Sequence, residues 1–154
     1  MAGRVDQRLK DLGFSLPVAA SPIANYVPAV RTGNLLFISG QLPLKDGQVA
    51  LEGKVGDTVS LEQAVEAARL CAFNLIAQAK SAIGDLDNVV RIVKLTGFVA
   101  CVPGFAQHPQ VINGASDVMV QVFGDIGRHA RAAVGAPSLP RNAPVEVDAV
   151  FEVA

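Results

Sequence analysis

The pattern of apolar and polar residues predicts two helices that each bury one face. Apolar residues recur every three or four positions from Ser60 to Ile83, which is typical of an amphipathic helix. Ser60 and Gln63 have the spacing of a capping box at its start, and Gly84 is expected to end it. A second helix is predicted from Gln110 to Phe123. Its buried face is expected to include Val111, Val118, Met119, Val122 and Phe123.

Strands are predicted where apolar residues alternate with polar ones or where β-branched residues gather. A turn at Arg31–Asn34, which contains Gly and Asn, is expected to join the first two strands as a hairpin. In chain order the predicted strands are Tyr26–Val30, Leu35–Ser39, Val89–Val102, Arg131–Val134 and Val145–Val153. The last of these has the most regular alternation.

Three other segments complete the chain. Val5 to Leu12 is predicted to form a short amphipathic helix that Gly13 ends. Leu16 to Pro28 is apolar and contains prolines, so we expect an extended arm. Gly40 to Gly56 is polar and rich in glycine, which is typical of a loop.

The order of these elements predicts a two-layer α+β fold. One mixed β-sheet with two helices on one face is the simplest way to pack them. Residues 1–154 are expected to form a single domain, in which residues 1–25 supply an N-terminal helix and arm. The other face of the sheet is still apolar and is expected to need a partner chain.

Composition supports an assembly of identical chains. Hydrophobic residues make up 51% of the chain and charged residues only 18%, yet no apolar stretch is long enough to span a bilayer. The excess of apolar surface therefore predicts a homo-oligomer. The net charge of −1 and the scattered basic residues give no footprint for nucleic acid. The first residues lack the apolar core of a signal peptide, so we expect a cytoplasmic protein without a membrane partner.

Arg131 is the strongest candidate for a binding residue. A guanidinium beside an apolar run is costly to bury without a partner, and its planar fork suits a carboxylate. The structural alternative is an ion pair with Glu146 or Asp148 on a neighbouring strand or chain.

The histidines and cysteines are weaker candidates. His108 and His129 lack the spacing of metal ligands and are expected to be packing or surface residues, although His129 would face a cleft if its strand begins early. Cys71 and Cys101 are expected to be small, buried, reduced residues.

Several blocks of the chain resemble the Rid family, also called YjgF/YER057c/UK114 or, in older naming, endoribonuclease L-PSP. The first block contains Asn25-Tyr26-Val27-Pro28 and Ser39-Gly40-Gln41-Leu42-Pro43. The others are Val89–Phe98, Val111-Ile112-Asn113-Gly114, Ala130-Arg131, Leu139-Pro140 and Val145-Glu146-Val147-Asp148-Ala149. The resemblance extends from about Tyr26 to the C-terminus.

This resemblance implies a chorismate-mutase-like fold and a homotrimer with three clefts between neighbouring subunits. The best-known members are hydrolases that deaminate enamines and imines, such as 2-aminoacrylate, to 2-keto acids and ammonia without a cofactor or metal. It implies that Glu146, Tyr26 and Ser39 are catalytic and that Arg131, Asn113 and Gly40 bind the substrate. In this assignment Arg131 holds the carboxylate and Glu146 positions the attacking water.

The chain also departs from the family pattern. Ala133 stands where many members have a cysteine. The Gly40–Ser60 connection and the stretch around Pro103–Pro109 are longer than in compact members, and the N-terminal helix and arm are additional. These differences indicate a divergent subgroup.

Two other functions compete with imine hydrolysis. The clefts of the trimer could bind a keto acid or related carboxylate without turnover, but the presence of Glu146 favours catalysis. RNA cleavage with inhibition of translation is the function in the older family name. The neutral charge and the absence of a basic or aromatic platform count against it.

Overall fold

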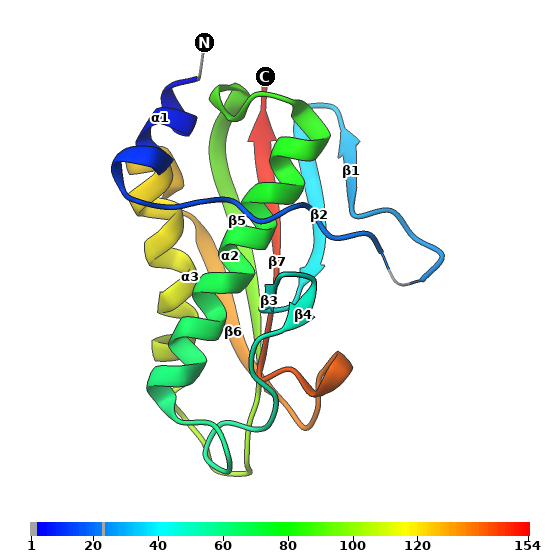
Figure 1. The fold of residues 1–154 in the computed structure, drawn as a ribbon, viewed down its shortest axis with the longest axis vertical. Coiled ribbons are helices and arrows are strands. Elements are labelled where there is room, and N and C mark those ends of the chain that lie inside the picture. The colour runs from blue at the N-terminus through cyan, green and yellow to red at the C-terminus, as the bar shows by residue number, and fades with distance from the viewer. Residues whose placement is uncertain (1–2, 23) are drawn as a thin grey trace.

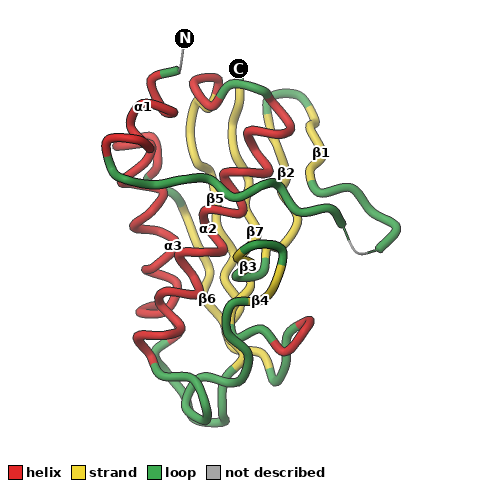
Figure 2. The backbone as a smooth tube through the Cα atoms, viewed as in Figure 1, coloured by secondary structure: helices red, strands yellow, loops and turns green. Residues whose placement is uncertain are grey.

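The computed structural model describes residues 3–22 and 24–154, and it has a helical layer on one face of a five-stranded sheet (Figure 1). Figure 2 shows the same two layers coloured by secondary structure. The helices are α1 (Arg4–Asp11), α2 (Leu61–Ile83) and α3 (His108–Phe123), with short 3-10 helices η1 (Leu86–Asn88), η2 (Gly124–Gly127) and η3 (Pro140–Asn142). The strands are β1 (Ala29–Thr32), β2 (Leu35–Gln41), β3 (Leu44–Lys45), β4 (Gln48–Val49), β5 (Val89–Ala100), β6 (Ala130–Ala136) and β7 (Val145–Val153).

The main sheet is mixed, as the sequence predicted. Its strand order is β1-β2-β7-β5-β6, and β5 and β6 are parallel while the other neighbouring pairs are antiparallel. A parallel pair needs a crossover, and α3 supplies it. Strands β3 and β4 form a separate two-stranded hairpin inside the segment that was predicted to be a loop. Strands of two residues are too short to leave an alternating pattern in the sequence.

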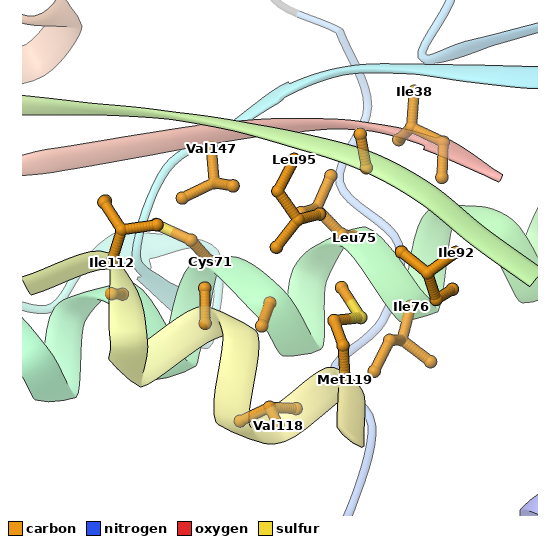
Figure 3. Close-up of a cluster of buried hydrophobic side chains, with 14 of the residues drawn as sticks. Ile38, Cys71, Leu75, Ile76, Ile92, Leu95, Ile112, Val118, Met119 and Val147 are labelled. Carbon is orange, nitrogen blue, oxygen red and sulfur yellow. The ribbon is translucent and has the colours of Figure 1, made fainter. Parts of the chain in front are cut away.

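The long helix α2 begins and ends where the pattern predicted. The Ser60 hydroxyl accepts a bond from the Gln63 amide at 3.2 Å, and the Ser60 amide donates to the Gln63 side chain at 2.9 Å, which completes the capping box. Gly84 follows the helix with φ +81°, a conformation that favours glycine. The predicted buried residues of α3 are all buried, and Figure 3 shows Val118 and Met119 packed in the core with α2 and the sheet.

Some element boundaries differ from the prediction. Helix α3 begins at His108, two residues early, because Pro109 is tolerated in a first helical turn where its missing N–H would have no partner. Strand β1 begins at Ala29, so Tyr26 lies in the loop before it. The hairpin turn itself is at Gly33 and Asn34, with Gly33 at φ +56°.

The N-terminal helix packs against the rest of the molecule, and the segment after it crosses the helical layer. Val5 and Leu9 of α1 are buried, and the amides of Arg4 and Val5 donate to the Asp87 carboxylate at 2.7 and 2.8 Å. The chain then crosses in front of α2 toward β1 (Figure 1). Residues 14–22 of this crossing contain no helix or strand, in agreement with the predicted arm.

The side chains of strand β7 alternate between the two faces of the sheet. Its odd-numbered residues, Val145 to Val153, are buried under the helices, and the even-numbered ones are only partly buried. The strand register places Phe98 beside Glu146 and Phe37 beside Val150 on the face away from the helices. Phe37 is 46% exposed and Val134 45%. The uncovered face is therefore apolar only in part, because Lys94, Thr96 and Asp148 lie on it as well, and the expectation of an apolar face is corrected to a mixed one.

Candidate active site

Four of the six predicted site residues lie around one pocket at the ends of β2 and β7. These are Tyr26, Ser39, Gly40 and Glu146, and we call the cavity the Glu146 pocket. Residues 20–22 of the N-terminal arm and the segment Pro140–Arg141 form its other walls. The cavity has a volume of about 570 Å³ including its open mouth.

A β-bulge shapes the floor of this pocket. Between the pairs Ile38–Ala149 and Gln41–Val147, β2 contains one residue more than β7. The extra residue falls at Ser39-Gly40. Bulges bend a strand and redirect side chains, and they are frequent beside active sites.

Glu146 is the one acidic residue among those that line the pocket. Its carboxylate is half-buried and forms no hydrogen bond or ion pair within residues 3–22 and 24–154. Burial raises the pKa of Glu146 above its usual value, and the negative charge of Asp148 raises it further. An unpartnered carboxylate of this kind is suited to exchange protons with a ligand.

Gly40 allows the Glu146 side chain to take this position. A Cβ atom on Gly40 would lie 2.9 Å from the carboxyl carbon of Glu146, closer than such atoms normally approach. A side chain at position 40 would therefore displace the Glu146 carboxyl group from the place it has here.

Buried amides hold the neighbouring backbone in place. Gln41, 7% exposed, donates to the Ser39 carbonyl at 3.0 Å, and Gln78, 3% exposed, donates to the Ala20 carbonyl at 2.7 Å. Gln78 also contacts the Gln41 side chain at 3.4 Å. The Ser39 hydroxyl donates to the Val27 carbonyl at 3.1 Å, and Tyr26 is half-exposed at the mouth. This network joins the arm, β2 and α2 around the pocket.

The other two predicted residues, Arg131 and Asn113, meet elsewhere. The register of β6 against β5 pairs Arg131 with Leu95, so its side chain points toward the helices. One terminal nitrogen, Nη1, donates to Asn113 at 2.8 Å and to Ser116 at 3.1 Å. The other, Nη2, donates to the Pro109 carbonyl at 3.3 Å. We call this cluster the Arg131 site.

Within the described part of one chain, Arg131 forms no ion pair with Glu146 or Asp148. Both carboxylates belong to the sheet face away from the helices, whereas Arg131 is on the helical side. The bonds that Arg131 does form all go to uncharged oxygens of α3. Two of its five N–H groups, Nε–H and one on Nη2, have no acceptor in the described part of the chain. Two N–H groups of this kind are what a bidentate carboxylate requires.

His129 and Ser116 support the guanidinium. His129 Nδ1 lies 2.7 Å from the Gly127 carbonyl and Nε2 lies 2.8 Å from the Ser116 hydroxyl. Burial lowers the pKa of His129, and the charge of Arg131 lowers it further. In the neutral ring the carbonyl fixes the proton on Nδ1, so Nε2 accepts from Ser116, whose oxygen in turn accepts from Arg131. The prediction that His129 is a packing residue is thus correct, and the residue that it positions is Arg131.

The remaining candidates lie outside both places. Cys71 is buried, as predicted, and burial raises the pKa of its thiol. Cys101 is only partly buried, contrary to the expectation, and its sulfur lies 3.5 Å from His108 Nε2, a proximity that the sequence spacing did not indicate. Ala133 packs against the core. Within residues 3–22 and 24–154 no three His, Cys, Asp or Glu side chains are placed to hold a metal ion, and no helix is long and apolar enough to cross a membrane.

Sequence reasoning missed several residues around these sites. Ser116 follows Asn113 by three positions, a spacing that places both on one face of a helix and could have identified it. Arg141 follows Leu139-Pro140 and precedes Glu146, but a lone arginine in a turn gives no signal. Gln41 and Gln78 are far apart in the sequence, and their contact depends on the fold.

Before any relative is considered, the fold and the two clusters describe a two-layer α+β protein with a half-buried carboxylate in one pocket and, elsewhere, an arginine held by three bonds to α3. The chain belongs to the family described as "YjgF/chorismate mutase-like, putative endoribonuclease", whose model matches residues 6–153. The predicted Rid resemblance is therefore confirmed.

Three relatives show how closely the chain is matched along its length. Protein TCP17 of Trypanosoma cruzi is 46% identical over 153 residues, which are 99% of this chain and 96% of that protein. A crystal structure of an Agrobacterium tumefaciens protein of unknown function has a TM-score of 0.91 and 54% identity over 97% of this chain and 92% of that one. A crystal structure from Shewanella oneidensis, described as a "putative endoribonuclease", has a TM-score of 0.95 and 32% identity over 98% of this chain and 100% of that one. The fold thus extends over the N-terminal helix and arm in these relatives as well.

Proposed function

We propose that this protein hydrolyses reactive enamines and imines, 2-aminoacrylate or other 2-imino acids, to 2-keto acids and ammonia, without a cofactor and in the cytoplasm. The observation that carries the proposal is Glu146. A half-buried carboxylate costs free energy, and here no described residue compensates it. A water molecule or a substrate nitrogen in the pocket would supply the missing partner.

The chemistry requires few groups because the substrate is already reactive. An enamine is first protonated at carbon, which gives an iminium whose carbon is electrophilic. Water then adds to the C=N carbon while Glu146 accepts a proton from it, which leaves a hydroxyl and an amine on the same carbon. The same carboxyl returns the proton to nitrogen and then takes the hydroxyl proton as the C–N bond breaks, so that the products are a 2-keto acid and ammonia. A pKa raised toward neutrality suits a group that must both accept and return a proton.

Arg131 would orient the substrate by its carboxylate. Two free N–H groups and three bonds to α3 make it a fixed, preorganised fork, and fixing the carboxylate also fixes the adjacent imine carbon. The Tyr26 and Ser39 hydroxyls lie at the Glu146 pocket, where Tyr26 would donate a hydrogen bond to the added oxygen and Ser39, whose own proton goes to the Val27 carbonyl, would accept one from the attacking water. Gly40 would leave its backbone open to the substrate, and Asn113 would act by holding Arg131.

Arg131 and Glu146 of one chain face opposite sides of the sheet, so a complete site requires a second chain. We propose a homotrimer in which the partly apolar sheet face is covered and the Arg131 site of one subunit meets the Glu146 pocket of its neighbour. The half-exposed Phe37 and Val134 support this arrangement because they are apolar side chains on the face that would be covered.

Binding without turnover is the second candidate. The Arg131 site alone would suffice to bind a keto acid, and it is the more completely built of the two places. RNA cleavage is disfavoured because the chain has a net charge of −1, and a polyanion needs a basic surface.

A coupled assay separates these functions. An amino-acid oxidase or a serine dehydratase generates the imine or enamine, and its decay is followed with and without this protein. Acceleration that is lost in Arg131→Ala and kept in Arg128→Ala, an exposed arginine on the same part of the chain, supports the proposal. Binding of 2-keto acids without any acceleration would contradict hydrolysis and support the binding module.

A further inference from the structure

A second arginine, Arg141, lines the Glu146 pocket. It is the one basic residue among the described residues that line it, as Glu146 is the one acidic residue. Building on the proposed function, we infer that Arg141 binds a second anionic group of the substrate. The preferred substrate class is then the 2-imino acids with an acidic side chain, the imines of dicarboxylic 2-keto acids.

The backbone at Arg141 is held in a conformation that ordinary residues rarely adopt. Arg141 has φ +56° and ψ +26°, and Asn142, the next residue, has φ +57°. Two consecutive left-handed residues with side chains are unfavourable, and such conformations persist where the surroundings impose them, often at ligand sites. Here the Ala143 amide bonds to the Pro140 carbonyl at 3.1 Å, and the Gly53 amide bonds to the Asn142 carbonyl at 2.9 Å.

The bond from Gly53 gives a structural role to the Gly40–Ser60 connection, which the resemblance led us to expect to be longer than in compact family members. This hydrogen bond holds the backbone of the η3 turn, from which the Arg141 side chain extends. The backbone that carries the Arg141 side chain is therefore held by two segments that are distant in sequence.

The Arg141 guanidinium has no internal use. It forms no hydrogen bond or ion pair with any residue in the described part of the chain, and its side chain is exposed. The exposed Arg128, in contrast, has a carboxylate partner in Asp125 at 3.5 Å. A charge held over a pocket with all its donors free is arranged to meet a ligand anion.

The number of cations then sets the number of anions. In the proposed site, Arg131 of a neighbouring subunit holds the carboxylate next to the imine carbon, which leaves Arg141 without a partner if the side chain is neutral. A substrate with a second carboxylate would pair with both arginines. With its two carboxylates at the two arginines, such a substrate would have its imine carbon between them, beside Glu146.

The test uses ligands that differ only in one end. 2-Oxoglutarate and 2-oxopentanoate have the same chain length, and only the first has a distal carboxylate. Calorimetry on the full-length protein is expected to show 2-oxoglutarate binding on the order of 10-fold more tightly or better, the usual strength of a charge-assisted bond. Arg141→Gln should reduce the ratio to near one by weakening 2-oxoglutarate alone, Arg141→Lys should keep part of it, and Arg128→Gln should leave it unchanged. An unchanged ratio in Arg141→Gln, or no preference in the wild type, overturns the inference.

Turnover distinguishes this inference from the function on which it rests. The imines of glutamate and norvaline, made with amino-acid oxidases, are the reactive counterparts of the two ligands. Tighter binding of 2-oxoglutarate without hydrolysis of either imine would support the role of Arg141 and overturn the proposed function. Hydrolysis of both imines at equal rates, without a preference in binding, would keep the proposed function and overturn the role of Arg141.

Discussion

The Arg131 site and the Glu146 pocket are built in opposite ways. At the Arg131 site most polar groups have a partner: the guanidinium donates to Asn113, Ser116 and a carbonyl, Ser116 bonds to His129, and only two N–H groups of Arg131 are left without an acceptor in the described part of the chain. In the Glu146 pocket the carboxylate has no partner among the described residues, although buried amides hold the backbone around it. One place is rigid and nearly satisfied, and the other is rigid but has an unpartnered charge at its centre.

This difference indicates a division of work between binding and chemistry. A binding arginine needs a fixed direction, which its neighbours provide. A group that transfers protons needs a pKa displaced from its usual value, which an unpartnered and half-buried position provides. Since the two side chains lie on opposite sides of the sheet, the proposed site takes them from two chains. The following predictions, from the largest effect to the smallest, test this comparison.

Arg131→Ala should have the largest effect. Removal of the guanidinium leaves no fixed cation for the carboxylate, and kcat/KM should fall by about 10³-fold or more. The variant should remain a folded oligomer, because the bonds it loses go to neutral oxygens near the surface. Light scattering and imine-decay assays measure both properties. A monomeric or unfolded variant would show instead that Arg131 has a structural role.

Glu146→Gln should lower turnover by on the order of 10²-fold while ligand binding is spared. The free energy of unfolding of this variant, in contrast to its turnover, should not fall. The raised pKa means that the protonated form is favoured in the fold: the stabilisation is present below the ordinary value of 4.5 and is lost as pH rises through the raised pKa. At pH 7 the neutral glutamine should therefore leave the free energy of unfolding equal or higher. A clear loss of stability in denaturant titrations would indicate a hidden partner for the carboxylate.

Gly40→Ala should have an intermediate effect. The new methyl group would meet the Glu146 carboxyl group and displace it, and turnover should fall by roughly 10-fold while keto-acid binding at Arg131 changes little. Gly47→Ala is a control, since a Cβ atom there meets nothing within 4 Å, although its φ of +77° adds strain. Equal activity in Gly40→Ala and the wild type would mean that the position of Glu146 is unimportant.

The smallest effect concerns His129 and pH. Its pKa is lowered, so the neutral ring is favoured in the fold: this stabilisation is present above the ordinary value of 6.5 and is lost as pH falls through the lowered pKa. Protonation removes the acceptor for Ser116 and places a charge beside Arg131. Denaturant titrations between pH 7.5 and 5 should therefore show a smaller loss in His129→Gln than in the wild type. Identical pH profiles would remove His129 from the network.

The fold was largely predictable because its signals are local. The capping box at Ser60, the β7 alternation and Gly84 are short patterns, and each formed the element it predicted. The β3–β4 hairpin and the early start of α3 depend on too few residues to leave such a pattern.

The candidate site was predictable in its members but not in its geometry. The resemblance identified the six residues, yet whether Arg131 and Glu146 share a face depends on the register of β6 and β7 against β5, which no local pattern fixes. Arg141 was missed because its place beside the Glu146 pocket depends on the tertiary structure, including the hydrogen bond from Gly53 to the η3 turn.

The central claim, that one site is assembled from two chains, can be tested by mixing two inactive variants. Arg131→Ala supplies an intact Glu146 pocket, and Glu146→Gln supplies an intact Arg131 site. After unfolding together and refolding at equal amounts, about one quarter of the clefts in a cyclic trimer would combine both intact halves. We predict that the mixture regains about that share of wild-type activity, while each variant refolded alone stays inactive. A mixture no more active than its components would contradict a shared site and place the chemistry within a single chain.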